Sequence, residues 1–264
     1  MKLAITTVDA FTNKVFSGNP AAVCLLDHEL SADQMQTIAM EMNLSETAFV
    51  QRTSESDSFV LRWFTPVLEI DLCGHATLAS AYWMLKSGWA KAGETIRFQT
   101  LSGELKVKSD GEWLEMDFPL IPTTVAKHPF FVDNFFGAKI SQAAKLKKNW
   151  IFELEDADAI ASCSPDFSIV KQHSEEGIII TAYGKGSFDI YSRFFGPNVG
   201  IDEDPVTGFA HCALMDYWNQ RSGKSTLKAY QASKRGGVLH LEKREDRVII
   251  RGQAIKVLSG EIEF

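Results

Sequence analysis

One acidic side chain, Glu46, stands where an expected helix has ended and an expected strand begins. Its neighbours Leu44, Ala48 and Phe49 are apolar. A carboxylate held among apolar side chains is suited to proton transfer, because such surroundings let a protein control the protonation of a general acid or base. The competing interpretation is an ordinary loop glutamate in water, and this segment alone leaves both open.

Two further segments, Asp71–His75 and Glu203–Gly208, place a glycine and polar side chains at the start of an expected helix. A helix N-terminus carries unpaired N–H groups and positive potential, so it favours a bound carboxylate. His75 and Asp204 are therefore candidate acid–base or hydrogen-bonding groups beside such an anion. The alternative is structural, with Asp204 and Thr207 capping their helix.

The same residues do not indicate a metal or nucleotide site. Cys73 lies near His75 and His211 precedes Cys212, but neither pair has the C-x-x-C spacing of structural zinc sites. The glycines show no G-x-G-x-x-G or P-loop spacing. Cys73 itself is either a reactive thiol, since thiolates are favoured at helix N-termini, or a small buried apolar side chain.

The elements that carry these residues belong to an internal repeat. Four motifs recur in the same order: Arg62–Pro66 and Arg193–Pro197, Gly74–Ala76 and Gly208–Ala210, Tyr82–Trp83 and Tyr217–Trp218, Lys86–Gly88 and Arg221–Gly223. A fainter match relates Ser45–Glu46 to Ser174–Glu175. Such a series of matches at nearly constant offset predicts two structurally similar halves.

Each repeat contains a helix that is expected to be buried on all sides. The run from Ala76 to Leu85 carries no charge on any face, and Gly88 stands where a left-handed C-terminal cap is wanted. We expect helices over about 75–87 and 209–221. A separate surface helix begins at Ser31, which forms a capping box with the glutamine three residues later.

Strand-like runs flank both expected helices, which predicts an α+β fold of two pseudo-symmetric halves. Each half would be a curved β-sheet or barrel wrapped on its central helix. The prolines between Pro119 and Pro129 mark the expected boundary. The predicted halves are 1–118 and 119–264, and the final strand is free to pack back on the first half.

Composition narrows the class of protein. The 264 residues include 27 Lys and Arg against 34 Asp and Glu, a net charge of −7, which argues against a nucleic-acid binder. No apolar run approaches the roughly 18 residues of a membrane span, and the first residues do not resemble a signal peptide. The four scattered cysteines are typical of reduced thiols. We expect a cytoplasmic protein with no membrane partner.

Taken together, the motifs resemble the phenazine-biosynthesis PhzF-like family over nearly the whole chain. The resemblance implies a diaminopimelate-epimerase-like fold, a site in the cleft between two halves, and a homodimer. The motifs that carry it are Val8–Thr12, Gly18–Val23, Asn43–Phe49, Arg62–Pro66, Cys73–Thr77 and Glu203–His211.

The resemblance also implies roles for particular residues. Glu46 would be the acid/base, with His75 and Asp204 as its partners in a cofactor-independent isomerisation of a small carboxylate metabolite. No metal, flavin, nicotinamide or pyridoxal is expected. The residues expected to contact substrate are Ser45, Cys73, Gly74, Thr207, Gly208 and Phe209.

The sequence departs from related patterns at two positions. Phe209 stands where a serine is common in the family, and Asp204 stands where two-cysteine epimerases have their second cysteine. A symmetrical two-thiol racemase is therefore not supported. Two alternatives stay open: a racemase or epimerase using unequal bases, such as Cys73 with Asp204 or Glu46, and a non-catalytic small-molecule-binding protein on the same fold.

Overall fold

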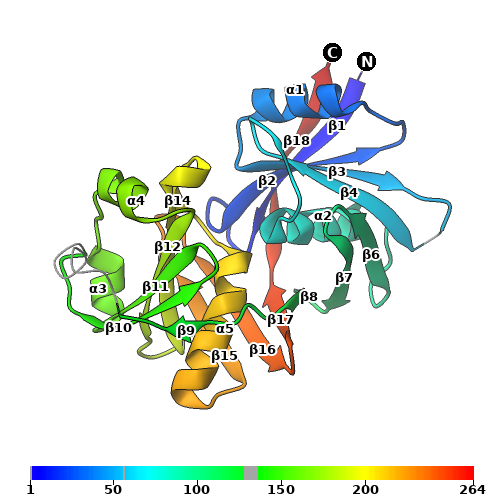
Figure 1. The fold of residues 1–264 in the computed structure, drawn as a ribbon. Helices are drawn as coiled ribbons and strands as arrows, with labels where there is room; N and C mark the ends of the chain where they lie inside the picture. Colours follow the sequence, from blue (N-terminus) through cyan, green and yellow to red (C-terminus); the bar gives the residue numbers. More distant parts are fainter. Residues whose placement is uncertain (1, 56, 128–135) are drawn as a thin grey trace. The chain divides into compact units, whose positions relative to one another are not determined.

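The computed structural model describes residues 2–55, 57–127 and 136–264 (Figure 1). Contacts divide the chain into two compact units. Unit 1 comprises Met1–Asp117 and Arg251–Phe264, and unit 2 comprises Phe118–Ile250.

Unit 1 is a curved sheet with one helix on each face. Its strands pair in the order β18-β1-β2-β3-β4-β6-β7-β8, and the short β5 pairs with β4. In Figure 1, α1 and α2 lie on opposite faces of β1–β4. The elements are β1 (Lys2–Ala10), β2 (Asn19–Leu26), α1 (Ala32–Met42), β3 (Glu46–Arg52), β4 (Ser58–Phe64), β5 (Glu69–Ile70), α2 (Gly74–Ser87), β6 (Thr95–Thr100), β7 (Gly103–Asp110), β8 (Trp113–Pro119) and β18 (Ala254–Glu263).

Unit 2 repeats this plan with its own helices. Its strands pair in the order β9-β10-β11-β12-β13-β15-β16, and the short β14 pairs with β13. The elements are β9 (Thr124–Val125), β10 (Ile140–Leu146), β11 (Asn149–Leu154), α3 (Ala157–Ser162), α4 (Phe167–His173), β12 (Gly177–Tyr183), β13 (Ile190–Gly196), the 3-10 turn η2 (Pro197–Val199), β14 (Ile201–Asp204), α5 (Gly208–Ser222), β15 (Thr226–Gln231), β16 (Gly237–Arg244) and β17 (Arg247–Gly252).

The topology of the two units confirms the internal repeat. In unit 1, β2–β3 and β4–β6 are parallel, and the pairs β1–β2, β3–β4, β4–β5 and β6–β7 are antiparallel. In unit 2, β11–β12 and β13–β15 are parallel, and the corresponding pairs β10–β11, β12–β13, β13–β14 and β15–β16 are antiparallel. The predicted α+β fold of two pseudo-symmetric halves is therefore confirmed.

The central helices α2 and α5 begin and end within one residue of their predicted bounds. Every residue of α2 from His75 to Ala81 is buried, as the uncharged run predicts. Gly88 and Gly223 end the two helices in the left-handed conformation, which a residue without a Cβ adopts without strain. The capping box of α1 at Ser31 is also present.

The strand register corrects one of the predicted matches. Thr47 pairs with Phe64 in unit 1, and Ile178 pairs with Phe195, the residue equivalent to Phe64, in unit 2. The residue equivalent to Glu46 is therefore Gly177, one place before Ile178. The match of Ser174–Glu175 to Ser45–Glu46 is wrong, because Ser174 caps the end of α4 before β12 begins.

Gly177 has no room for a side chain. A Cβ on this residue would lie 2.7 Å from the ring of Phe194 and 2.7 Å from the carbonyl oxygen of Phe195. These distances are well inside van der Waals contact, and one of the two atoms belongs to the backbone of the neighbouring strand. The repeat thus places an acid at this position in unit 1 and none in unit 2.

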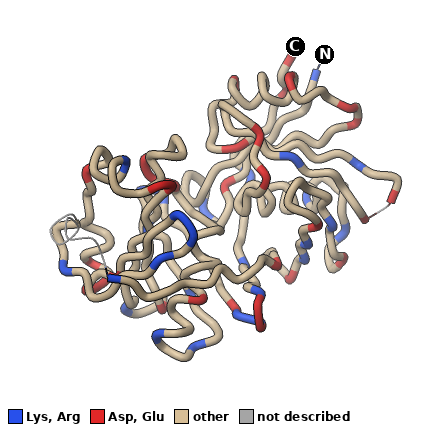
Figure 2. The backbone as a smooth tube through the Cα atoms, in the orientation of Figure 1, with Lys and Arg blue, Asp and Glu red and all other residues tan. Residues whose placement is uncertain are grey.

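Charged residues of both signs are spread through each unit in Figure 2, in keeping with a composition in which acids only modestly outnumber bases. Among the described residues, no helix has the length and apolar character needed to cross a bilayer.

Candidate functional site

Glu46 is the first residue of β3 and is 8% exposed. The parallel pairing of β2 with β3 sets Glu46 beside Ala21, close to the start of both strands. Such burial of a carboxylate is unfavourable unless a polar or charged group accompanies it.

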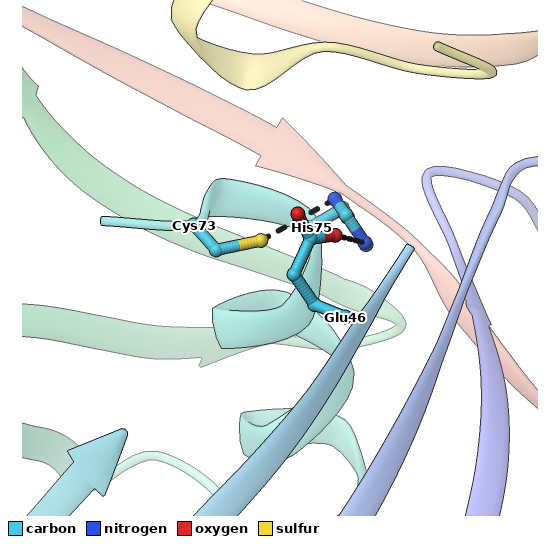
Figure 3. A group of neighbouring side chains, drawn as sticks. All are labelled: Glu46, Cys73 and His75. Carbon is cyan, nitrogen blue, oxygen red and sulfur yellow. Dashed lines mark hydrogen bonds and ion pairs between the residues drawn. The ribbon is translucent and has the colours of Figure 1, made fainter. Parts of the chain in front are cut away.

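The accompanying group is His75, the second residue of α2 (Figure 3). Its Nε2 lies 3.0 Å from Oε2 of Glu46, and the residue is 6% exposed. On the other side of the ring, Nδ1 lies 3.2 Å from Nδ2 of Asn19 and 3.5 Å from Sγ of Cys73. Cys73 is the N-cap residue of α2 and is buried. Three separate elements, β2, β3 and α2, therefore bring an amide, an acid, an imidazole and a thiol together.

The environment determines the charge of these groups. Burial opposes a charged imidazole, but the hydrogen bond to the Cys73 sulfur and the Glu46 carboxylate favour it, and the pKa of His75 is well above its usual value of 6.5. Burial also raises the pKa of the Cys73 thiol, so the thiol stays protonated. The negative partner of His75 is then Glu46. Of the two interpretations of Cys73, the structure supports the small buried side chain, because burial outweighs the effect of the helix end on the thiol.

The acid, thiol and imidazole are also potential metal ligands, since one ligand atom of each lies within 4.8 Å of the others. A metal ion, however, binds a single imidazole nitrogen together with its other ligands. Here the thiol faces Nδ1 and the carboxylate faces Nε2, on different edges of one ring. In this arrangement the acid and the thiol contact different nitrogens of one imidazole.

The predicted residues of unit 2 form a second cluster at the start of α5. The Thr207 hydroxyl donates to Oδ2 of Asp204 at 2.5 Å. Gln231, which is fully buried at the end of β15, fixes this loop: its Oε1 accepts from the Thr207 backbone N–H at 2.8 Å, and its Nε2 donates to the Asp204 carbonyl at 2.7 Å. Gly208 begins α5, and Phe209 follows it half-buried.

The strand leading into each central helix is held by the same kind of ion pair. Arg62 on β4 binds both carboxylate oxygens of Glu69 on β5, each at 2.7 Å. Arg193 on β13 binds both oxygens of Glu203 on β14 at 2.6 and 2.9 Å. The paired arginine of the repeated R-x-F motif thus positions the segment before each helix N-terminus.

The structure brings Glu46, Cys73, Gly74 and His75 together in unit 1, with Ser45 half-buried just before β3. It brings the remaining predicted residues together in unit 2: Asp204, Thr207, Gly208 and Phe209. Sequence reasoning missed Asn19 and Gln231. Asn19 stands in one of the motifs that carry the family resemblance, and nothing in the sequence around Gln231 signals its role.

The fold and these two glycine-led helices define a class of diaminopimelate-epimerase-like proteins. A hydroxyproline epimerase of Agrobacterium vitis shares this fold, with a TM-score of 0.64 over 99% of this chain and 92% of that one, at 9% identity. The family profile of phenazine biosynthesis-like proteins (PhzC-PhzF) matches residues 8–260, and the chain belongs to this family.

Two relatives match this chain over nearly its whole length. An uncharacterized isomerase of Halalkalibacterium halodurans is 43% identical over 99% of both chains. The crystal structure of a PhzF-family phenazine biosynthesis protein of Enterococcus faecalis is 44% identical, covers 100% of both chains and has a TM-score of 0.94.

Proposed function

We propose that this protein is an isomerase in which Glu46 moves a proton between two carbons of a small carboxylate substrate. The observation that carries the proposal is the buried contact between Glu46 and His75, because a charged pair of this kind rarely lies inside a protein without a function. The name of the Halalkalibacterium halodurans relative, an uncharacterized isomerase, supports the same reaction class.

In the proposed mechanism, the Glu46 carboxylate takes a proton from a carbon next to an unsaturated or carbonyl group. The electron pair of the broken C–H bond is delocalised into that group, and protonated Glu46 then returns the proton to another carbon. His75 orients the Glu46 carboxylate and stabilises its negative charge. The reaction needs no metal or organic cofactor, because one residue both accepts and returns the proton.

The proposal extends to substrate binding. Backbone N–H groups at Gly74 and Gly208 would hold anionic groups of the substrate, since each begins a central helix. Asp204 of unit 2 would complete the site as a hydrogen-bonding partner, in a cleft between the halves. Ser45, Cys73, Thr207 and Phe209 would contact the substrate. We further propose that the protein acts in the cytoplasm as a homodimer.

The direct test compares the parent protein with Glu46→Gln, which keeps the shape of the side chain and removes its proton. Both are incubated in D₂O with a panel of small acids that includes a dihydro-hydroxyanthranilate and trans-4-hydroxy-L-proline, and C–H exchange is followed by NMR. We expect Glu46→Gln to exchange about 10²–10⁴-fold more slowly. Equal exchange rates would make Glu46 a structural acid, and a parent that binds but exchanges no compound would support the non-catalytic alternative.

One observation favours a second candidate, a racemase with unequal bases. The Cys73 thiol lies 3.5 Å from the His75 imidazole, at the N-terminus of a central helix. Replacement by Cys73→Ser separates the two candidates, because only the racemase needs the thiol. Exchange that survives in Cys73→Ser and is lost in Glu46→Gln supports the isomerase.

A further inference from the structure

Asn19 is a buried polar residue to which the proposed proton transfer gives no role. It is the first residue of β2 and is fully buried. Its amide nitrogen lies 3.2 Å from Nδ1 of His75, on the side of the ring opposite Glu46. A buried amide is unfavourable unless its hydrogen bonds are satisfied, so this contact is a specific feature of the fold.

The backbone holds Asn19 firmly in place. The preceding Gly18 has a φ of +66°, and a Cβ there would lie 2.1 Å from the carbonyl oxygen of Ala10. Ala10 on β1 is in turn the pairing partner of Asn19. The turn and the strand pairing thus place the backbone from which the Asn19 amide reaches the imidazole.

Together with the Cys73 thiol, which faces the same nitrogen at 3.5 Å, this contact favours one tautomer of a neutral His75. A neutral imidazole has one donor and one acceptor nitrogen. When the Asn19 amide donates to Nδ1, that nitrogen is the acceptor and the ring proton is on Nε2, which faces Glu46 at 3.0 Å. The tautomer is therefore the one that can donate toward the carboxylate.

The same amide also suits a protonated ring. Nδ1 then becomes a donor, and a half-turn of the amide about its terminal bond brings Oδ1 to the position of Nδ2 as an acceptor. A leucine of similar size offers neither atom, and an aspartate offers only acceptors. Because an amide carries both a donor and an acceptor, Asn19 can serve both states of the imidazole without a change in shape.

We propose that Asn19 is a positioning residue that lets His75 hold or release its proton while keeping Nε2 directed at Glu46. The inference rests on the proposed function, because an acid that changes charge during turnover needs a neighbour whose protonation can follow. Asn19 acts through His75 and does not itself take part in the proton transfer.

The test is an NMR titration of the ring carbons of His75 between pH 5 and 10 in the parent, Asn19→Leu and Asn19→Asp, with the signal assigned from His75→Gln. We expect Asn19→Leu to lower the pKa of His75, because the hydrogen bond that the charged ring loses is stronger than the one that the neutral ring loses. We expect Asn19→Asp to raise it by about 1–3 units, the usual effect of an adjacent carboxylate. No substrate is needed, so the result is independent of the exchange assay for Glu46.

The chain offers a matched control in unit 2. Asn149 is also buried and is the first residue of β11, the strand equivalent to β2, but its amide donates to Glu176. Asn149→Leu should leave the pKa of His75 unchanged. If Asn19→Leu and Asn19→Asp also leave it unchanged, or shift it in the same direction, Asn19 only fills space and the inference is overturned. Should Asn19→Asp fail to fold, Asn19→Leu alone tests the inference: a lower pKa of His75 supports it, and an unchanged pKa of His75 overturns it.

Discussion

His211 in α5 is a fully buried histidine, and its replacement by asparagine should change how the free energy of unfolding depends on pH. Its Nδ1 donates to the carbonyl oxygen of Thr207 at 2.8 Å, and its Nε2 accepts from the hydroxyl of Ser192 at 3.3 Å. With no acid beside it in these contacts, burial lowers the pKa of His211 to about 4. The folded protein therefore keeps this ring neutral at pH values where the unfolded chain protonates it.

The size of the effect follows from the two pKa values. An unfolded histidine titrates near 6.5, so the folded value of about 4 is lower by about 2.5 pH units. At about 1.4 kcal/mol per unit, protonation of the unfolded chain lowers the free energy of unfolding by up to about 3.5 kcal/mol. Above pH 6.5 both states are neutral and the loss is zero. It grows as the pH falls from 6.5 toward 4, because only the unfolded state binds the proton.

The assay is urea unfolding of the parent and of His211→Asn at intervals from pH 7.5 down to pH 4.5. Asparagine can still donate to Thr207 but leaves the Ser192 hydroxyl without its partner, so at pH 7.5 the variant should be less stable by about 1–3 kcal/mol. This gap should narrow by about 2 kcal/mol as the pH falls to 4.5. The exposed His28→Asn serves as the control. A gap that is the same at every pH would refute the reasoning.

Three further predictions follow from the described contacts. The attraction between His75 and Glu46 should be fully present below pH 6.5 and lost as the pH rises through the raised pKa of His75. His75→Gln should therefore lower the free energy of unfolding, measured with urea, by about 3–5 kcal/mol at neutral pH and by less at alkaline pH. Cys73 should react slowly with iodoacetamide at pH 7.5 and rapidly after unfolding, followed by mass spectrometry, because it is buried and protonated; fast labelling of the folded protein would contradict this. Ser31→Ala should lower the free energy of unfolding by about 1 kcal/mol, since it removes the hydrogen bond that the Ser31 hydroxyl accepts from the Gln34 backbone N–H.

The two central helices were predictable because their signals are local. An uncharged run followed by glycine identifies α2 without any knowledge of what surrounds it. The roles of Asn19 and Gln231 were not predictable, since each depends on a partner brought close only by the strand register: His75 lies 56 residues from Asn19, and Thr207 lies 24 residues from Gln231. The same limit explains the error at Glu175, because the sequence does not show where α4 ends and β12 begins.

The sequence left two interpretations of Cys73 open for a related reason. Its place at the N-terminus of α2 is readable from the sequence and favours a thiolate. Its burial depends on strands that pack around the helix, and burial prevails over the helix end. The protonation of Cys73 therefore cannot be predicted from its motif alone, because it depends on neighbours that are distant in sequence.

Glu46 in unit 1 and Gly177 in unit 2 occupy equivalent positions, and this difference limits how the duplicated fold could change in evolution or by design. A second acid in unit 2, at the position equivalent to Glu46, cannot be gained by a single substitution, because the ring of Phe194 and the carbonyl oxygen of Phe195 already occupy the space a side chain would need. A smaller residue at 194 would have to come first, and strand β13 would still have to move away from β12. Unit 2 is therefore separated by several changes from a symmetrical arrangement of two acids.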